Sequence, residues 1–261
     1  MTERIQTRKE NGAGWLVFNN PARHNALSLD MWEAIPEVMA DFHADEAVRV
    51  IVMTGAGDKA FVSGADISEF EQHRAAAEAI AKYDAASDLA FSALKRATKP
   101  TIAIIRGFCM GGGVGIALGC DLRIASDDAR FGIPAAKLGL GYQFEPVQKL
   151  VATVGHAYAR EILFTGRQFS AAEALGMGLV NRVLPATELE PFVEKYVAAI
   201  AGNAPLTIHA AKLAIDAACL DPADREMSEI EAAIARCMTS QDYAEGRQAF
   251  TQKRRPAFRG R

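Results

Sequence analysis

Two glycine-containing turns carry the backbone groups that could do chemistry in this sequence. One spans residues 63–66 with the sequence SGAD, and the other spans residues 111–113 with the sequence GGG. Each follows an apolar run of strand length and precedes helical sequence. Two backbone N–H groups converging from such turns would form an oxyanion hole, and losing one donor from such a hole raises a barrier by about 3 kcal/mol. The same turns could simply punctuate an α/β sheet, and the pattern alone favours that plainer interpretation.

A dinucleotide-binding turn is a second interpretation of the glycine-rich stretch. Residues 113–119 have the sequence GVGIALG, a GxGxxxG spacing after a strand-like run, and Asp127 or Asp128 follows within reach of a ribose. However, the motif lies in the middle of the chain, and no clear strand-helix-strand run follows Asp128. We therefore rank a dinucleotide-binding oxidoreductase below an oxyanion-hole enzyme.

The elements that must position these turns alternate between strand and helix. Pro36 lies inside one helical segment and predicts a kink or a split helix there, and a capping box begins at Ser170. From residue 187 onward the pattern is helical only. The order predicts an α/β core followed by a helical C-terminal portion. Strands are predicted at residues 15–18, 48–53, 101–105, 121–125 and 180–184, and helices at residues 29–42, 74–96, 144–154 and 157–164.

Composition and charge limit the classes of protein that this chain can belong to. It has 261 residues, a net charge of −3, 50% hydrophobic residues and 23% charged residues, which is ordinary for a globular protein. Such a small charge gives no field that would attract nucleic acid or an anionic membrane. No apolar run reaches the roughly 18 residues of a membrane span, and the polar N-terminus shows no secretory signal. Four cysteines without CxxC spacing indicate buried thiols in a reducing cytoplasm.

Several motifs, taken in order, give the chain a family resemblance. Over nearly its whole length it resembles the crotonase superfamily, the superfamily of enoyl-CoA hydratases and isomerases. Any one motif is only suggestive, but their order and spacing together identify the family. The matching segments are residues 21–27 (PARHNAL), 60–67 (AFVSGADI), 107–121, 131–134 (FGIP), 164–166 (FTG), 174–183 (ALGMGLVNRV) and 250–255 (FTQKRR).

The resemblance implies an α/β fold with two parts. A ββα spiral core is expected over residues 1–200, and a helical C-terminal region that builds a trimer is expected over residues 201–261. The implied assembly is a homotrimer or a dimer of trimers, and the implied substrate is an acyl-CoA thioester. Since CoA is part of that substrate, no separate cofactor and no metal are expected.

The resemblance also implies roles for individual residues. The N–H groups of Ala65 and Gly112 match the family's oxyanion donors, which stabilise a thioester enolate. Arg23 falls in the loop along the CoA phosphates, and Lys253 falls in the tail that reaches CoA from a neighbouring subunit; solvated surface charges are the alternatives. Asp66 is expected to serve the turn itself rather than act as an acid. The residues expected at the CoA site are Arg23, Gly64, Ala65, Asp66, Ile67, Gly111, Gly112, Phe250 and Lys253.

Departures from the family pattern affect its acids and bases. The two glutamates with which family hydratases place and deprotonate water fall at Gly115 and Ala135, and neither residue can transfer a proton. The isomerase acid falls near Gln143, which cannot serve either. Glu145 is the nearest carboxylate, although a helix-start carboxylate that complements the dipole is the favoured alternative. Tyr142 resembles a tyrosine of the methylmalonyl-CoA decarboxylase branch that contacts the departing carboxylate, but that branch also carries an acid at the position of Gly115.

Three hypotheses about function remain open. The first is a hydratase or isomerase in which Glu145 is the acid or base. The second is a decarboxylase of malonyl-type CoA thioesters in which Tyr142 orients the carboxylate. The third is a non-catalytic acyl-CoA binder. The predicted protein is therefore an atypical member of the family that lacks both hydratase glutamates.

Overall fold

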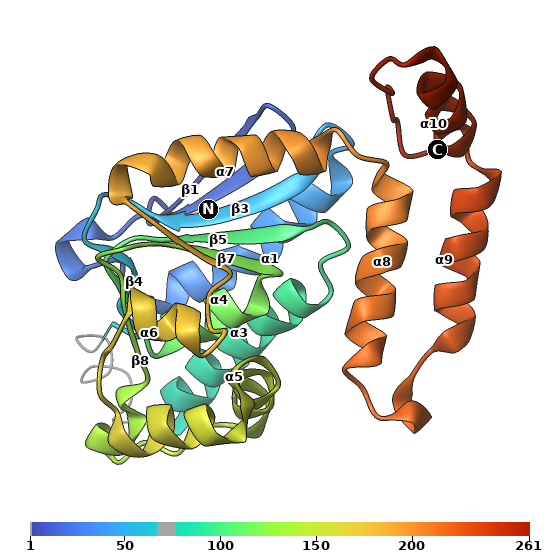
Figure 1. Ribbon diagram of the computed structural model, residues 1–261. Helices are drawn as coiled ribbons and strands as arrows, with labels where there is room; N and C mark the ends of the chain where they lie inside the picture. Colours follow the sequence, from blue (N-terminus) through green and yellow to red (C-terminus); the bar gives the residue numbers. More distant parts are fainter. Residues whose placement is uncertain (1, 67–76) are drawn as a thin grey trace.

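Two β-sheets organise the part of the chain that the structure describes, residues 2–66 and 77–261, and the larger has six strands (Figure 1). In this computed structural model the strand order of the large sheet is β1-β2-β3-β5-β7-β10. An antiparallel hairpin forms one edge, and the remaining pairs are parallel. The strands are β1 (Ile5–Glu10), β2 (Ala13–Phe18), β3 (Val50–Gly55), β5 (Thr101–Ile105), β7 (Leu122–Ser126) and β10 (Arg182–Leu184).

The second sheet is built from short strands in the order β4-β6-β8-β9. Along the chain, each of β4, β6 and β8 follows a strand of the large sheet, and a helix comes next: β3-β4-α3, β5-β6-α4 and β7-β8-α5. This repeated unit of two strands and a helix confirms the predicted ββα core. The strands are β4 (Ala60–Val62), β6 (Phe108–Met110), β8 (Arg130–Gly132) and β9 (Phe169–Ser170).

Helices cover both faces of the large sheet (Figure 1). α7 (Ala186–Ala201) lies across one face. On that face, the side chains of Ile102 and Ile104 from β5 belong to the same buried cluster as the apolar side chains of α7. Ala103 and Ile105 belong to the cluster on the other face, as the alternation of side chains along a strand requires. The helices in that second cluster are α1 (Leu29–Ala44), α3 (Ala77–Lys95), α4 (Gly112–Gly119), α5 (Phe144–Thr165) and α6 (Ala171–Gly176).

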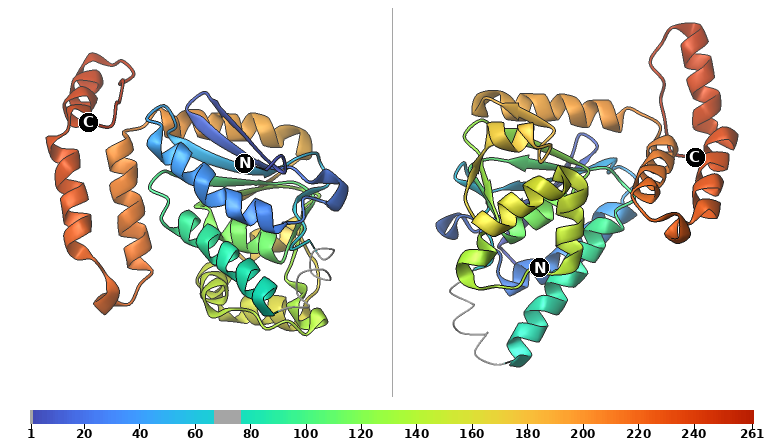
Figure 2. Two further views of the ribbon diagram at one scale, coloured as in Figure 1. Left: turned by 180° about the vertical axis from the view of Figure 1, so that it is seen from behind. Right: turned by 60° about the horizontal axis from the view of Figure 1, so that its bottom comes forward.

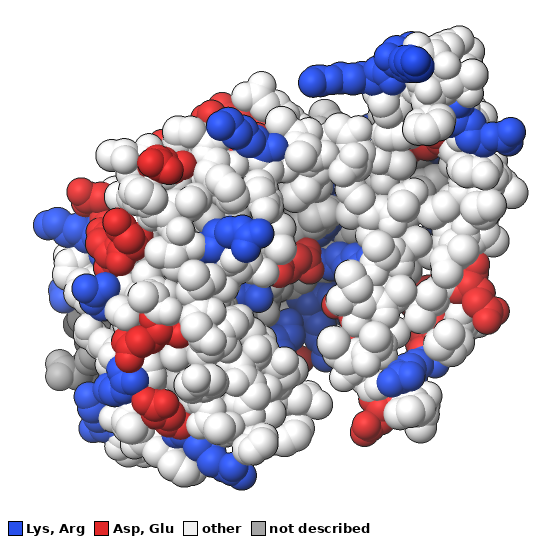
Figure 3. All heavy atoms as spheres, in the orientation of Figure 1, with Lys and Arg blue, Asp and Glu red and all other residues white. Residues whose placement is uncertain are grey.

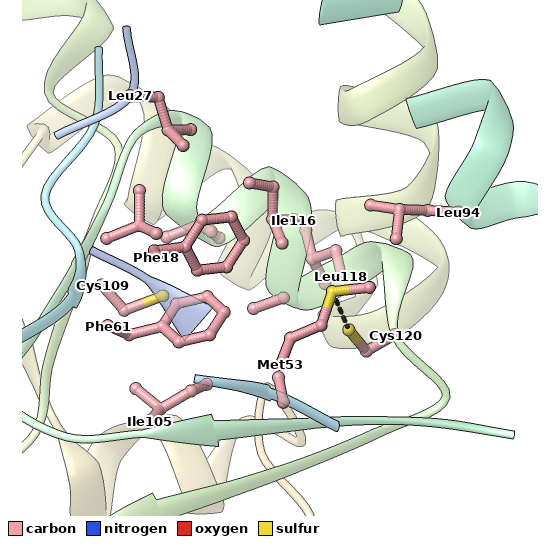
Figure 4. Close-up of a cluster of buried hydrophobic side chains, with 14 of the residues drawn as sticks. Phe18, Leu27, Met53, Phe61, Leu94, Ile105, Cys109, Ile116, Leu118 and Cys120 are labelled. Atoms are coloured by element: carbon pink, nitrogen blue, oxygen red, sulfur yellow. Dashed lines mark hydrogen bonds between the residues drawn. The ribbon is translucent and has the colours of Figure 1, made fainter. Parts of the chain in front are cut away.

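Two of the cysteines lie inside the core, and two do not. Cys109 and Cys120 are buried, and the Cys120 thiol donates to the Met53 sulfur at 3.8 Å (Figure 4). Burial raises the pKa of the Cys120 thiol to about 12, so this thiol stays protonated and unreactive. Cys219 is exposed and Cys237 is partly exposed, so the expectation that every thiol is buried is wrong. Both lie on the C-terminal helices, which bury less of their surface than the core does.

The sequence predicts an interruption at Pro36 in one helix and a break between the helices at residues 144–154 and 157–164. The two predictions have different outcomes. α1 runs unbroken through Pro36, so a split helix is wrong there. Packing of the buried face of α1 outweighs the one backbone hydrogen bond that proline removes. In contrast, Gly155 takes φ 75° and ψ 163° inside α5 and separates the two predicted helical pieces. The capping box at Ser170 is present as predicted.

The C-terminal helices form an arm that projects from the core (Figures 1 and 2). This C-terminal arm consists of α8 (Pro205–Ala218), α9 (Met227–Thr239) and α10 (Gln241–Gln252). At its base the Lys212 ammonium pairs with the Asp121 carboxylate at 2.6 Å. The division predicted at residue 200 falls at the last turn of α7, and it stays a prediction about folding units. The short 3-10 helices are η1 (Pro21–Arg23), η2 (Pro134–Leu138) and η3 (Pro222–Asp224).

On the face drawn in Figure 3, basic and acidic side chains are interspersed. This face is hollowed between the core and the C-terminal arm, and basic side chains gather in that hollow. Among residues 2–66 and 77–261, no helix combines the length and apolar character needed to cross a bilayer. The same residues contain no group of three or more histidine, cysteine or acidic side chains placed to hold a metal ion.

Candidate active site

Ala65 lies in the turn after β4, where the chain runs beside Leu27. The two residues form an isolated parallel bridge, in which the Leu27 N–H donates to the Gly64 oxygen at 2.8 Å and the Asp66 N–H donates to the Leu27 oxygen at 2.9 Å. In a parallel bridge the residue between these two bonds directs its own N–H to the opposite side. The Ala65 N–H therefore faces away from Leu27. Gly64 takes φ +114°, which explains a glycine at this step of the turn.

Gly112 opens α4, directly after a turn that only glycine adopts readily. Gly111 takes φ 52° and ψ −115°, and its N–H donates to the Gly132 oxygen at 2.8 Å. The first N–H groups of a helix have no partner within the helix. The Gly112 N–H belongs to this set, so it is available to a ligand at the positive end of α4.

The two turns lie against each other, although they are far apart in the sequence. A Cβ atom built on Gly111 would lie 3.8 Å from the Cα atom of Gly64, and one built on Gly64 would lie 3.5 Å from the Met110 oxygen. Gly113 is closer still to β4, because a Cβ atom there would lie 2.3 Å from the Val62 oxygen. The fold thus brings together the two turns that carry Ala65 and Gly112.

Apolar groups occupy positions 115 and 135, where the family resemblance leads us to look for glutamates. Gly115 is buried in α4, and a Cβ atom built on it would lie 3.0 Å from Cζ of Phe91, a residue of α3. Any side chain at position 115 would therefore have to displace the Phe91 ring. Ala135 is also buried, in the first turn of η2. The site has neither a carboxylate at these positions nor room for one beside Phe91.

Tyr142 follows η2 and packs, half-buried, against the main core cluster. Loss of hydration raises the pKa of its phenol to about 12, and the neighbouring Cys109 thiol acts in the same direction. The phenol consequently keeps its proton at neutral pH. It can donate or accept a hydrogen bond, but it cannot act as a base there.

Glu145 lies in the first turn of α5, with an exposed side chain. Its carboxylate accepts a hydrogen bond from the Lys95 ammonium of α3 at 3.1 Å. A carboxylate in the first turn complements the helix dipole, and this ion pair ties α5 to α3. This arrangement favours the structural interpretation of Glu145 over the catalytic one.

Comparison with known proteins identifies the family of this chain. The model of the family "Enoyl-CoA hydratase/isomerase" matches residues 8–261. The chain belongs to the enoyl-CoA hydratase/isomerase family. It is 37% identical over 256 residues to the crotonyl-CoA hydratase of Syntrophomonas wolfei, covering 98% of both chains. It is 34% identical over 247 residues to the short-chain-enoyl-CoA hydratase of Clostridium acetobutylicum, covering 95% of this chain and 94% of the relative.

A solved structure of the enoyl-CoA hydratase/isomerase family has the same fold. The chain superposes on the enoyl-CoA hydratase/carnithine racemase of Magnetospirillum magneticum with a TM-score of 0.94 and 35% sequence identity. The superposition covers 100% of this chain and 97% of that one. This confirms the predicted α/β fold with helices at the C-terminus.

The residues expected at the CoA site fall in two separate places. Arg23 ends η1 with an exposed side chain, and its carbonyl accepts the Ser63 hydroxyl at 3.2 Å, beside the first turn. Asp66 is buried in that turn. Phe250 and Lys253 lie at the end of α10 on the C-terminal arm, apart from α4 in every view (Figures 1 and 2). Ile67 lies outside the described residues.

Helix packing accounts for the glycine spacing that suggested a dinucleotide fingerprint. Within α4, Gly115 packs against Phe91, and a Cβ atom on Gly119 would lie 3.1 Å from the Leu94 side chain. Small residues at these positions let α4 approach α3 closely. Together with the family membership, this favours the oxyanion interpretation of the turn over the dinucleotide one.

Sequence reasoning missed the aromatic residues around the turns. Phe91, Trp32 and Tyr83 lie in predicted helices, where their spacing indicates only a buried face. Periodicity identifies which side of a helix is buried, but not which residue of another helix it meets. No local signal distinguishes these three aromatics from ordinary core residues.

Proposed function

We propose that the protein acts on an acyl-CoA thioester and stabilises its enolate with the N–H groups of Ala65 and Gly112. The observation that carries this proposal is the meeting of the two turns: one N–H faces away from its bridge partner, and the other opens a helix beside it. Two fixed donors directed at a thioester oxygen stabilise the negative charge that develops on it. Such donors favour the transition state over the uncharged ground state, which is the condition for catalysis.

A panel of CoA thioesters tests this proposal directly. The protein is incubated with enoyl-, dienoyl- and malonyl-type CoA thioesters, and the products are identified by mass spectrometry. We expect turnover of at least one class. If every thioester stays unchanged while CoA still binds, the protein is a non-catalytic acyl-CoA binder and the enzymatic proposal is wrong.

Decarboxylation of a malonyl-type CoA thioester is the second candidate, and the surroundings of Tyr142 favour it. When the carboxylate leaves as CO2, the electrons of the broken C–C bond pass to the thioester as an enolate, which water then protonates at carbon. This step needs an oxyanion hole but no strong base. Apolar groups at Gly115 and Ala135 and a protonated phenol at Tyr142 suit such a site. Production of CO2 from malonyl-type thioesters supports this reaction, and their stability during long incubation excludes it.

A hydratase or isomerase that uses Glu145 makes a different prediction. Its Glu145→Gln variant would lose turnover of enoyl-CoA or dienoyl-CoA substrates, because an amide cannot transfer the proton. The ion pair between Glu145 and Lys95 leads us to expect that the variant keeps its activity. Full turnover in the variant removes this candidate.

We also propose that CoA is held at the turns by Arg23, Gly64, Asp66 and Gly111 of one protomer. Phe250 and Lys253 would then reach it from a neighbour in a homotrimer or a dimer of trimers. The C-terminal arm supports this assembly, because it holds apolar side chains out of the core: Ile215, Met227, Ile234, Met238 and Phe250. Light scattering after size-exclusion chromatography measures the mass, and a monomer would contradict the proposal.

A further inference from the structure

Two aromatic side chains, one from α1 and one from α3, form a hydrogen-bonded pair next to both turns. The Trp32 indole N–H donates to the Tyr83 hydroxyl oxygen at 2.9 Å, and the ring centroids lie 6.4 Å apart at an interplanar angle of 83°. Trp32 is only 2% exposed. Tyr83 is half-buried, so the indole end of the bond is the buried one, and losing the hydroxyl would leave the buried indole N–H unsatisfied.

Tyr83 forms a hydrogen bond beside the turn that carries Ala65. Its hydroxyl donates to the Leu27 oxygen at 3.4 Å. This oxygen also accepts the Asp66 N–H, one of the two bonds of the bridge that sets the direction of the Ala65 N–H. Tyr83 thus holds the carbonyl against which Ala65 is aligned.

Trp32 packs against the turn that carries Gly112. A Cβ atom built on Gly112 would lie 3.4 Å from Cζ2 of Trp32 and 3.7 Å from Cδ1 of Leu27. The indole therefore supports the backbone of Gly112 from the core side. Through one hydrogen bond, the pair links the support of Gly112 to the alignment of Ala65.

We infer that Trp32 and Tyr83 are positioning residues that fix the Ala65 and Gly112 N–H groups relative to each other. The inference rests on the proposed function, since it assumes that these two N–H groups form an oxyanion hole. Fixed donors need no reorganisation when charge develops, which is the source of their catalytic effect. A displacement of about 1 Å at such a site can cost about a hundredfold in rate. The Trp32 indole N–H and the Tyr83 hydroxyl both form hydrogen bonds within the protein. We therefore assign the pair a role through the backbone rather than on the substrate.

The test uses acetoacetyl-CoA, whose acidic α-carbon forms an enolate with its own ultraviolet absorbance. Titrating pH with the ligand at saturation gives the pKa of the bound ligand. An intact oxyanion hole lowers this pKa relative to free acetoacetyl-CoA. In Tyr83→Phe, which keeps the ring but loses the hydrogen bonds to Trp32 and Leu27, we expect the enolate to be stabilised about tenfold less, a rise of about one unit in the ligand pKa. The affinity for CoA itself should change less than twofold.

A matched control and a second variant complete the test. Tyr196→Phe removes a hydroxyl from α7, on the other face of the sheet, and should leave the ligand pKa unchanged. Trp32→Phe breaks the same pair from its other end and should raise the ligand pKa in the same direction as Tyr83→Phe. It serves as the decisive variant if Tyr83→Phe does not fold.

Two outcomes overturn the inference in different ways. If both variants bind the enolate as tightly as the wild type does, the pair has no positioning role, although the proposed function stands. If the wild type itself leaves the pKa of acetoacetyl-CoA unchanged, the oxyanion hole is wrong and the inference falls with it. A purely structural role would lower thermal stability and leave the ligand pKa at saturation unaltered.

Discussion

Two regions of the molecule are built in opposite ways. One is the corner, where the turns at residues 63–66 and 111–113 meet, and the other is the C-terminal arm. At the corner, backbone groups are fixed by buried residues of the same chain, such as Leu27 and Trp32. On the C-terminal arm, Ile234 is 51% exposed, Met238 is 57% exposed and Phe250 is 87% exposed. The described residues of the corner thus hold one another within one protomer, whereas the arm presents apolar surface of the kind that protein interfaces cover.

The two regions also differ in what holds their backbone. At the end of the arm, charged groups fold the last residues back onto α10. Asp242, only 3% exposed, accepts the N–H groups of Arg259 and Gly260 at 2.7 Å each. Glu245 forms a two-bond ion pair with Arg254, at 2.6 and 2.8 Å. Backbone hydrogen bonds and apolar packing therefore hold the turns that carry the proposed donors, whereas charged groups hold the last residues of the chain against α10, the helix that carries Phe250.

The largest effect is expected where α4 touches β4. In Gly113→Ala the added methyl group would lie 2.3 Å from the Val62 oxygen, so the start of α4 must move away from β4. Displacing the Gly112 N–H should lower turnover by about 10²- to 10³-fold. Turnover is measured on the thioester that the substrate panel identifies. Gly176→Ala, which has open space around it, is the control, and equal turnover in both variants would show that this contact does not position the donor.

The second prediction concerns the exposed apolar face of α9 on the C-terminal arm. Ile234 and Met238 are four residues apart on α9, so they share one face of the helix. Replacing both with aspartate should convert the proposed assembly to protomers, because charge on an apolar interface is costly to bury. Light scattering measures the mass, and circular dichroism should show an unchanged fold of the core.

Arg236→Asp on the same helix is the control for the double variant of the arm. Its side chain is exposed, and it lies two residues from both Ile234 and Met238, on the other side of the helix, so this variant adds an aspartate away from the apolar face. An assembly that survives the double aspartate variant would show that this face of α9 is not an interface between copies.

Position 115 tests how fully the corner excludes a carboxylate. Gly115→Glu must displace the Phe91 ring and bury a charge, which should reduce the free energy of unfolding by about 1–3 kcal/mol in urea titrations. Introducing one glutamate should not by itself produce hydration of crotonyl-CoA. Adding Phe91→Ala provides space and should recover part of the stability. Gly176→Glu, at an exposed position of α6, should leave stability nearly unchanged.

The smallest effect concerns the charges at the end of the arm. The Arg254 guanidinium and the Ala257 N–H lower the pKa of Glu245 to about 2, from an ordinary value of 4.5. Because the folded-state pKa is the lower one, this stabilisation is complete above pH 4.5 and is lost as pH falls from 4.5 towards 2. Hydrogen exchange of the arm should therefore distinguish Glu245→Gln from the wild type clearly at pH 6, by less at pH 3 and hardly at pH 2. A difference that persists at low pH would assign the effect to lost packing.

The sequence predicted the local elements around the corner and missed their neighbours. The turns at Ala65 and Gly112 were predictable because positive φ angles and close backbone contacts require glycine beside them. The capping box at Ser170 was predictable because both of its bonds lie within four residues. The Phe91 contact with Gly115 was not predictable, since the two residues come from different helices and nothing in either segment specifies the other.

By itself, the sequence determined the family, the alternation of strands and helices, and the turns that supply candidate donors. These properties depend on residue types at short spacing, which fix backbone conformation locally. Only the tertiary structure decided that the Ala65 N–H faces away from Leu27, that Gly112 rests on Trp32, and that Phe91 fills the space at position 115. Strand register and helix packing set these contacts, and both arise from the burial of whole faces rather than from any one segment.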